Sequence, residues 1–459
     1  MQLRTITLKP GERLTKALLK RSGGIDSSVI ASATAIIEDV CQRGDEALYD
    51  YSAKFDGVEK AMLGELRVSQ EEIDAAFELV DDELVVALEF AAEQIRDFHS
   101  RQVRQSWFTN PGDGIMLGSK ITPLNRVGIY VPGGRAQYPS SVLMNALPAE
   151  CAGVESIVMV APPTKEGTIA PITLVAAAIA GVTEIYKVGG AQAIAALAYG
   201  TESIPAVDKI VGPGNAYVAA AKKIVNGDVG IDMIAGPSEV LILADETAVP
   251  AFIAIDMMAQ AEHDPRAATY LVTTDETLIP LVGEALDVLL AETPRADITR
   301  QALENNSVAV VCVDEADAVA ASDFIAPEHL EVHMDHPFEL LGEIHNAGAI
   351  FLGPWTPEAI GDYVAGPNHV LPTGGTARFS SPLSVDDFIK KSSVISYSVD
   401  ALAQDAPAVE TIATQEGLWS HARSVSLRLD FLDALENDES DDDGQVGENK
   451  PSKGNGVTL

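Results

Sequence analysis

The chain has 459 residues, of which 47% are hydrophobic and 5% aromatic, and it carries a formal net charge of −37. This length suits two or three domains with large buried cores. Such an acidic surface argues against nucleic-acid binding, which needs a basic face for phosphate contacts. The sequence has no run of about 18 apolar residues, so we expect no membrane span. Its first residues lack the apolar stretch of a signal peptide.

The cysteines and the charge distribution point to a cytoplasmic protein. Three scattered cysteines form neither a disulfide framework nor a CxxC metal motif, which indicates a reducing compartment. Residues 436–459 hold 7 acidic and 2 basic residues, and their polar composition predicts a disordered tail. The rest of the negative charge lies on the folded part. We interpret it as a hydrated, self-repelling surface suited to a salty cytoplasm, where screening lengths shrink to about 3 Å near 1 M salt.

The N-terminal part predicts helices without evident chemistry. Residues 26–43 carry an apolar stripe at helical spacing, with Asp26 or Ser27 as the N-cap and Gly44 as the stop. The string SQEE, which begins at Ser69, is a capping box that predicts a long helix running toward His99.

From about Asn125 the chain alternates short β-branched runs with Ala-rich helical stretches. The runs RVGIYVPGG, SIVMVAPP, EIYKVGGAQ and KIVGPGN each end in a Gly/Pro turn. This alternation predicts a parallel, doubly wound sheet, whose ligands bind at the carboxyl ends of the strands. A second alternating block follows, with helices expected over 248–262 and 275–291. The chain is then rich in glycine over 340–400 and helical over 407–435.

The string FIAPEHLEVHMDHP contains a His pair at a spacing that resembles a zinc peptidase. Its apolar and polar residues alternate with period two, however, which predicts a half-buried strand. Positions four apart on a strand are separated by roughly 13 Å, so His329 and His333 cannot bind one ion. We expect His333, His336 and His345 to lie on the surface. Glu328 and His329 directly precede the strand and form a candidate acid/base pair.

Other polar residues stand out against apolar or glycine-rich surroundings. Gln260 and His263 are three apart on a predicted helix, which puts them on one face. Asp362 lies in a glycine-rich loop, and His421 lies near the C-terminus. Two His, one Asp and one Gln, without sulfur, suit a Zn²⁺ or Mn²⁺ site that is open to substrate.

Taken together, these strings resemble the histidinol dehydrogenase family. The resemblance runs from about residue 25 to 430. It rests on VGIYVPGG, YPSSVLMNALPA, GGAQAIAALAYGT, KIVGPGNAYVAAAKK, IDMIAGPSEVLILAD, QAEHDP, APEHLE, NAGAIFLG and GDYVAGPNHVLPTGGTARFSSPLSVDDFIKKSS. Several of these strings are ten or more residues long, which makes chance similarity negligible.

The resemblance implies a reaction and a set of site residues. The reaction is the NAD-dependent oxidation of L-histidinol to L-histidine through L-histidinal, the last steps of histidine biosynthesis. The acid/base pair is Glu328 and His329, and one Zn²⁺ per subunit, which orients the substrate, is held by Gln260, His263, Asp362 and His421. These six residues also contact the substrate in the family, together with Ser238, His369 and Glu416.

The resemblance also implies NAD contacts at Tyr130, Gln192 and Asn215. The dinucleotide fingerprint GxGxxG is not met, because Tyr217 occupies its last glycine position. This departure fits the family, which binds its cofactor in an incomplete Rossmann-like domain. The family is a homodimer whose C-terminal segment reaches the partner's site, so we expect Glu416 and His421 to serve the other subunit.

The fold implied is two Rossmann-like, doubly wound α/β domains of the aldehyde-dehydrogenase type, with small helical segments at both ends. The expected divisions are an N-terminal segment over 1–24, a first α/β domain over 25–129 and 239–381 with the metal and acid/base residues, an NAD domain over 130–238, a C-terminal segment over 382–435 and the tail over 436–459.

Three alternatives remain open at this point. A cysteine-dependent aldehyde dehydrogenase needs an activated thiolate. Cys41 and Cys312, however, are predicted to lie in the core, and Cys151 has no basic neighbour in the sequence. A related metal- and NAD-dependent dehydrogenase acting on another amino alcohol or a sulfonate would share the same motifs. A non-catalytic sensor would have no reason to keep the complete acid/base and metal set.

Overall fold

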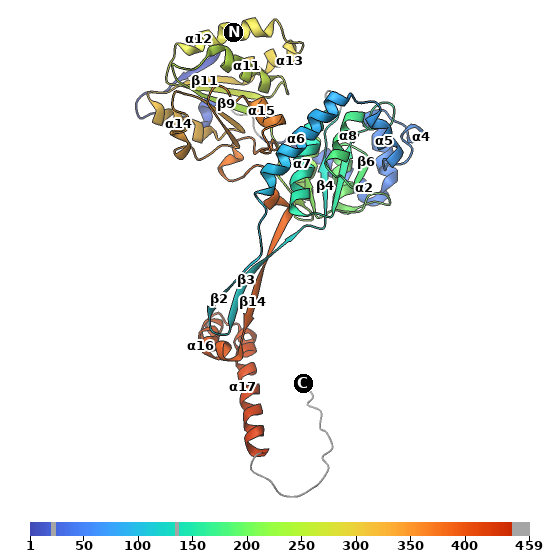
Figure 1. Ribbon diagram of the computed structural model, residues 1–459, viewed down its shortest axis with the longest axis vertical. Coiled ribbons are helices and arrows are strands. Elements are labelled where there is room, and N and C mark those ends of the chain that lie inside the picture. Colours follow the sequence, from blue (N-terminus) through green and yellow to red (C-terminus); the bar gives the residue numbers. More distant parts are fainter. Residues whose placement is uncertain (20–23, 134–136, 443–459) are drawn as a thin grey trace. The chain divides into compact units, whose positions relative to one another are not determined.

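The computed structural model describes residues 1–19, 24–133 and 137–442, and its contacts divide the chain into two units. Unit 1 comprises Met1–Val103 and Pro123–Lys390, and unit 2 comprises Arg104–Thr122 and Lys391–Leu459. Unit 1 contains two parallel sheets, each packed between helices, as the alternating sequence blocks predict (Figure 1). Among the helices that the structure describes, none combines the length and apolar character needed to cross a bilayer.

The first sheet of unit 1 has six parallel strands in the order β1-β11-β10-β9-β12-β13. Its strands are β1 Arg4–Thr7, β9 Glu239–Ala244, β10 Ala268–Thr273, β11 Ser307–Val311, β12 His329–His333 and β13 Ala349–Leu352. The helices of this part are α1 Lys16–Leu19, α11 Pro250–Ala261, α12 Leu278–Leu290, α13 Ala296–Asn306, α14 Glu315–Ile325 and α15 Glu358–Tyr363.

Successive side chains of these strands enter two different cores. On β9, Val240 and Ile242 pack with α11 and α12, whereas Leu241 and Leu243 pack with α14 on the opposite face (Figure 1). A sheet covered by helices on both faces buries every strand residue. All five residues of β12 are therefore buried. The prediction that this strand is half-buried is therefore wrong. His333, which was expected on the surface, is only 2% exposed. His336 and His345 are exposed, as predicted.

The second sheet of unit 1 has five parallel strands in the order β6-β5-β4-β7-β8. Its strands are β4 Arg126–Tyr130, β5 Ser156–Ala161, β6 Glu184–Lys187, β7 Lys209–Val211 and β8 Gly230–Ile231. The helices packed with it are α2 Ser27–Arg43, α3 Asp45–Tyr51, α4 Lys60–Leu63, α5 Gln70–Phe77, α6 Asp82–Ser100, α7 Pro139–Ala152, α8 Pro171–Ile179, α9 Gly190–Tyr199 and α10 Ala216–Val225.

The predicted grouping of residues 25–129 with 239–381 differs from the structure. Helix α2 packs against α9 and α10 in the core of the five-stranded sheet, and α6 packs beside α7 (Figure 1). The N-terminal segment, by contrast, supplies strand β1 to the six-stranded sheet. Which core a helix joins depends on contacts between residues far apart in the chain, and the sequence pattern does not carry that information.

Local signals in the N-terminal part are confirmed with one exception. Asp26 caps α2 by accepting the Ser28 N–H, and Gly44 ends it. Ser69 and Glu72 form the expected capping box. The helix that they open stops at Phe77, however, and a separate helix, α6, runs from Asp82 to Ser100. The prediction of one long helix is therefore wrong.

Unit 2 contains a small sheet in the order β14-β3-β2, in which β2 and β3 are antiparallel, and two long helices. Its elements are β2 Trp107–Gly112, β3 Ile115–Pro123, β14 Ile389–Tyr397, α16 Val399–Gln415 and α17 Trp419–Asp442. Helices α16 and α17 pack against each other. Helix α17 continues to Asp442, so residues 436–442 are helical and not disordered as predicted. The rest of that tail, residues 443–459, lies outside the described residues.

Gly212 follows β7 where the chain passes closely over β4. It adopts φ +108, its N–H donates to Asp232 at 2.8 Å, and its carbonyl accepts from Lys222 at 2.8 Å. A Cβ at this position would lie 2.3 Å from the Tyr130 carbonyl oxygen, so the close approach requires glycine.

Gly212→Ala and Gly227→Ala form a matched pair of substitutions. Gly227 has φ +115 and open space around its Cβ position, so alanine there adds only backbone strain, about 1–3 kcal/mol. At Gly212 the contact with Tyr130 adds about 1–3 kcal/mol more. We expect the thermal midpoint to fall in the order wild type, Gly227→Ala, Gly212→Ala. Equal losses for the two variants would contradict the role assigned to the contact with Tyr130.

Candidate active site

The predicted acid/base pair lies where the chain passes from α14 into β12. Helix α14 ends at Ile325, and the capping residue Ala326 is the single non-glycine residue with positive φ in the described part of the chain (φ 49). Pro327 and Glu328 follow, and His329 begins the strand. His329 pairs in register with Val240 near the start of β9 and Ala349 at the start of β13. The pair therefore lies at the amino ends of these parallel strands, unlike the carboxyl-end glycines of the other sheet.

His329 is 4% exposed, and its ring lies among acidic groups. Nδ1 is 3.7 Å from a carboxylate oxygen of Glu358 and 3.9 Å from one of Glu328, and Nε2 is 3.6 Å from Asp362 Oδ1. Burial alone would lower the pKa of His329, but the charges of these three carboxylates outweigh burial and raise it to about 10.

Glu328 is held by the backbone of the neighbouring strand. Its Oε2 accepts the Glu239 N–H at 2.9 Å, and the side chain is 7% exposed. Burial raises the pKa of this carboxyl to about 7, although the charge of His329 opposes the shift. A carboxyl that titrates near neutrality can exchange protons in either direction, which general acid/base catalysis requires.

Helix α15 brings two further carboxylates to His329. Glu358 and Asp362 are four residues apart, one helical turn, and so lie on the same side of this short helix. The N–H of Glu358 donates to the Glu331 carboxylate of β12 at 2.7 Å, which satisfies one of the helix's free N–H groups. Burial raises the pKa of Glu358 well above its usual value. For Asp362, burial acts in the same direction, but the contact with His329 outweighs it and lowers the pKa.

Glu358 was not singled out by the sequence. The only signal for it is its spacing from Asp362, which is common among exposed acidic pairs on helices. Its importance arises from burial, since it is 2% exposed and faces His329.

Gln260 lies on α11 directly opposite His329. Its amide is best oriented with the nitrogen toward the ring, where His329 Nδ1 at 3.1 Å, the Glu239 carbonyl at 3.2 Å and Glu358 at 3.1 Å are within reach and its two hydrogens can be donated to two of them. The opposite orientation would bring the amide oxygen against the two other oxygens. His263 lies just beyond the end of α11, not within the helix as predicted, but its N–H still donates to the Gln260 carbonyl at 3.3 Å.

Three of these side chains could hold a metal ion together. Ligand atoms of His263, Glu358 and Asp362 all lie within 4.8 Å of one another. Nitrogen and oxygen donors without sulfur suit Zn²⁺ or Mn²⁺. Gln260 is adjacent to this group through Glu358. The residues of unit 1 predicted as metal ligands therefore fit a divalent cation, with Glu358 as an additional donor.

A pocket of about 550 Å³ opens onto this group. His329, Asp362 and His369 line it, together with apolar side chains such as Phe351. The adjacent Asn368 fixes the loop of His369, since its amide donates to the Met144 carbonyl at 2.6 Å and accepts the Val370 N–H at 2.8 Å. Burial lowers the pKa of His369, which favours the neutral imidazole.

The remaining predicted substrate contacts lie on separate elements of the two units. Ser238 directly precedes Glu239 at the start of β9. Glu416 caps the C-terminal end of α16, and His421 lies in the first turns of α17. Both of these belong to unit 2.

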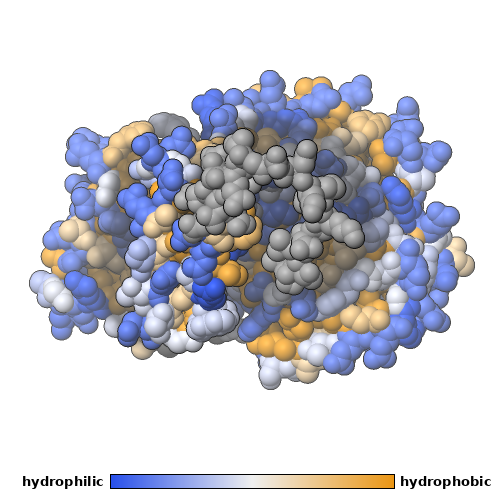
Figure 2. Space-filling model, turned by 90° about the horizontal axis from the view of Figure 1, so that it is seen from below, coloured by the Kyte–Doolittle hydropathy of each residue, from blue (hydrophilic) through white to orange (hydrophobic). Residues whose placement is uncertain are grey.

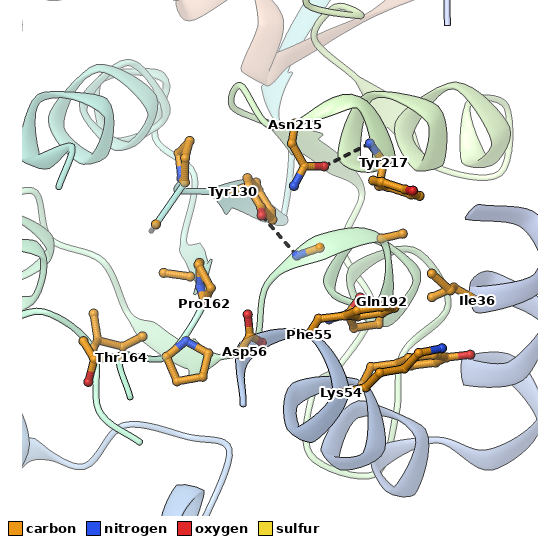
Figure 3. Close-up of a pocket in the computed structure, with 18 of the residues that line it drawn as sticks. Ile36, Lys54, Phe55, Asp56, Tyr130, Pro162, Thr164, Gln192, Asn215 and Tyr217 are labelled. Atoms are coloured by element: carbon orange, nitrogen blue, oxygen red, sulfur yellow. Dashed lines mark hydrogen bonds between the residues drawn. The ribbon is translucent and has the colours of Figure 1, made fainter. Parts of the chain in front are cut away.

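The three predicted NAD contacts line one pocket of about 1000 Å³ at the carboxyl ends of the five-stranded sheet (Figure 3). The Tyr130 hydroxyl accepts the Gly190 N–H at 3.1 Å. Asn215 caps α10, with its side-chain oxygen accepting from Tyr217 at 2.9 Å and from Val218 at 3.2 Å. Gln192 is 1% exposed, and its Oε1 has no hydrogen-bond partner among the described residues.

Asp56, Phe55 and Lys54 line the same pocket, although no motif in the sequence pointed to them (Figure 3). Burial raises the pKa of Asp56 to about 6, and its Oδ2 has no hydrogen-bond partner within the described part of the chain. A buried carboxylate of this kind can accept hydrogen bonds from ligand hydroxyl groups.

The thiols do not form a nucleophilic site. Desolvation raises the pKa of all three, that of Cys312 to about 12, so that none is an activated thiolate. Cys312 is buried, as predicted. Cys41 is exposed, which corrects the prediction that it lies in the core: the buried stripe of α2 ends at Val40, and Cys41 lies a third of a turn farther round.

Comparison with known proteins identifies the family to which the chain belongs. The profile of the histidinol dehydrogenase family matches residues 19–429. The chain belongs to the histidinol dehydrogenase family. It is 53% identical over 396 residues to a histidinol dehydrogenase of Halalkalibacterium halodurans, covering 86% of this chain and 93% of the relative. It is 52% identical over 413 residues to one from Geobacter metallireducens, covering 90% and 94%.

A solved structure of the same family superimposes on almost the whole chain. The histidinol dehydrogenase of Elizabethkingia anophelis aligns with a TM-score of 0.88 and 38% identity, covering 94% of this chain and 99% of that one. The chain is therefore an oxidoreductase of the histidinol dehydrogenase family with its α/β fold.

Proposed function

We propose that this chain oxidises L-histidinol to L-histidine, through L-histidinal, by two successive hydride transfers to NAD⁺. The observation that carries the proposal is the group around His329, where an imidazole, Glu328 and the candidate metal ligands of α11 and α15 meet in one pocket. Membership of the histidinol dehydrogenase family supplies the reaction.

His329 is the group that takes protons from the substrate in this proposal. An alcohol loses a proton as its hydride leaves, and the neutral form of the His329 imidazole can take it and pass it on. Glu328 then activates the water that hydrates the aldehyde before the second oxidation. Its pKa of about 7 suits a base that must be regenerated within each cycle. The Glu239 N–H holds Glu328 at a fixed position during these steps.

The residues that would hold Zn²⁺ are Gln260, His263 and Asp362, with Glu358 beside them and His421 from the partner subunit. When bound, the cation would fix the amino and imidazole nitrogens of the substrate and offset the carboxylate charges that raise the pKa of His329. A substrate with two nitrogen donors would fit this site, whereas a simple alcohol would not. His369 and Ser238 would add substrate contacts, and Glu416 suits the charge of the substrate amine.

The pocket of Tyr130, Gln192 and Asn215 is the proposed NAD site. Its size and its position at the carboxyl ends of parallel strands suit a dinucleotide. Gln192 offers a buried acceptor that has no partner among the described residues, and Asp56 offers a carboxylate for ribose hydroxyl groups. Catalysis requires the nicotinamide end of the cofactor to reach the pocket of His329.

We further propose that two copies form a homodimer with shared active sites. Unit 2 exposes large apolar side chains on both of its helices, as an interface between copies would require. They include Ile412, Trp419, Leu427 and Phe431, which are 53–74% exposed. Glu416 and His421 lie in the same region, so that the second copy would receive them.

The remaining proposals concern the environment of the enzyme. Three free thiols, one of them exposed, suit a reducing cytoplasm. Hydrophilic residues cover much of the face shown in Figure 2, and the net charge of −37 supports adaptation to high salt.

Removing the proposed base tests the central claim. We expect His329→Asn to lower kcat by about 10²- to 10⁴-fold while the fold is retained, because the proposed base for the alcohol proton is lost. Wild type should form two NADH per histidine. A variant with Cys41→Ser, Cys151→Ser and Cys312→Ala serves as the control and should keep most of the wild-type turnover. Loss of turnover in the folded control, with full activity in His329→Asn, would favour a thiol mechanism instead.

Mixing two inactive variants tests the shared site. Co-expressed His329→Asn and His421→Asn should recover about a quarter of wild-type turnover, because a mixed dimer places both lesions in one site and leaves the other intact. If His421 serves its own subunit, both sites of the mixed dimer are damaged and no activity returns. Each variant alone is the baseline.

Titration with KCl tests the salt proposal. We expect both the thermal midpoint and the turnover of wild type to rise from low salt to multimolar KCl, since screening relieves repulsion between acidic groups. An equal midpoint and turnover at both extremes would contradict adaptation to salt.

A further inference from the structure

A second group of titratable side chains lies deeper on the same strand. Asp256 of α11 and Glu331 and His333 of β12 are 7%, 0% and 2% exposed. One ligand atom from each lies within 4.8 Å of the other two. Asp256 is one turn before Gln260 on α11, and His333 is four residues after His329 on β12. The two elements therefore carry two successive polar groups between them, and the mechanism uses only the first.

Several atoms of this group lack hydrogen bonds. Both ring nitrogens of His333 and Oε2 of Glu331 are buried and have no hydrogen-bond partner in the described part of the chain. Buried polar atoms without partners are rare and point to a missing ligand or to water. His333 Nε2 faces Glu331 Oε2 at 3.3 Å and Asp256 Oδ2 at 3.9 Å, so these atoms converge on one point.

The separations suit a shared ion better than a direct contact. A charge-assisted N–H···O⁻ bond is about 2.7–2.9 Å long, shorter than either distance. Two donors that each bind zinc at about 2.1 Å with tetrahedral angles are themselves about 3.4 Å apart. The observed 3.3 Å and 3.9 Å bracket this value.

The charge of the group also lacks compensation. Two carboxylates face one imidazole, and no lysine or arginine forms an ion pair with them among the residues that the structure describes. Burial, followed by the charge of Glu331 and the contact between the two carboxyl groups, raises the pKa of Asp256 to about 8. Buried charges are otherwise paired or bind metals.

We propose that Asp256, Glu331 and His333 form a second, closed divalent-cation site, suited to Zn²⁺ or Mn²⁺ and separate from the catalytic one. A nitrogen and two carboxylate oxygens are donors that both ions accept, and water can complete the coordination. The burial of all three ligands gives the site a structural role rather than a catalytic one.

The site would act on the active centre through Glu331. One carboxylate oxygen faces the proposed ion, and the other accepts the Glu358 N–H at 2.7 Å. An ion that fixes this carboxylate would therefore fix the start of α15, which carries Glu358 and Asp362. This consequence rests on the proposed function, whereas the presence of the ion does not.

Metal content separates the two sites. Wild type, Asp256→Asn, Asp362→Asn and the double variant are dialysed against excess Zn²⁺, desalted and measured by mass spectrometry for zinc per chain. We expect about two, one, one and none, respectively, because each substitution removes a ligand from one site only. His336→Gln is the control for surface binding, since His336 lies beside Asp335 on the exposed surface, and it should keep both ions.

Two further measurements test the second site if the Asp256→Asn variant does not fold. Chelator should lower the thermal midpoint of Asp362→Asn, which keeps only the buried ion, but not that of the double variant. Anomalous diffraction at the zinc edge from wild-type crystals should show a peak among the three side chains. One zinc per wild-type chain, unchanged in a folded Asp256→Asn and without an anomalous peak in the group, would overturn the second site. Unchanged zinc and turnover in Asp362→Asn would instead count against the proposed function.

Discussion

The hydrogen bond from the Glu358 N–H to the Glu331 carboxylate joins helix α15 to strand β12 of the six-stranded sheet. Helix α15 is only six residues long, too short to be stable without tertiary contacts. A buried acceptor on β12 satisfies its first N–H group and thereby sets the position of Glu358 and Asp362 against His329. The candidate metal ligands and the acid/base pair are close together because this anchor holds two elements that the chain brings from different places.

The electrostatics of the site follow from the same geometry. Glu328, Glu358 and Asp362 surround one buried imidazole. Burial, together with repulsion between the carboxylates, raises the pKa of Glu328 and Glu358, whereas the contact with the imidazole lowers the pKa of Asp362. As a result, Glu328 can exchange a proton near neutral pH, and Glu358 and Asp362 can serve as ligands for a cation. A similar group lies deeper in the core, where two buried carboxylates, Asp256 and Glu331, both face the imidazole of His333.

The two sheets carry their candidate sites at opposite ends of their strands, which the sequence pattern does not reveal. In the five-stranded sheet, the glycine turns at the carboxyl ends of the strands surround the candidate cofactor pocket, as the rule for open α/β sheets predicts. In the six-stranded sheet, the proposed acid/base residues lie at the amino end of β12, beside the amino ends of β9 and β13. Ala326 adopts a left-handed backbone conformation that turns the chain between α14 and this site. The conformation costs about 1–3 kcal/mol, and such strain is often found beside functional sites.

The sequence by itself determined the alternating α/β architecture, the caps of α2 and α5, and, through family motifs, the residues around His329 and Tyr130. These signals are local, because helix caps and strand periods depend on neighbours a few residues away. Only the tertiary structure decided that His333 is buried, that Glu358 joins the site and that residues 25–103 pack with the five-stranded sheet. Burial is a property of contacts between distant segments: the same alternating pattern in β12 describes a half-solvated strand or a fully covered one. Only the helices on both faces distinguish these two cases.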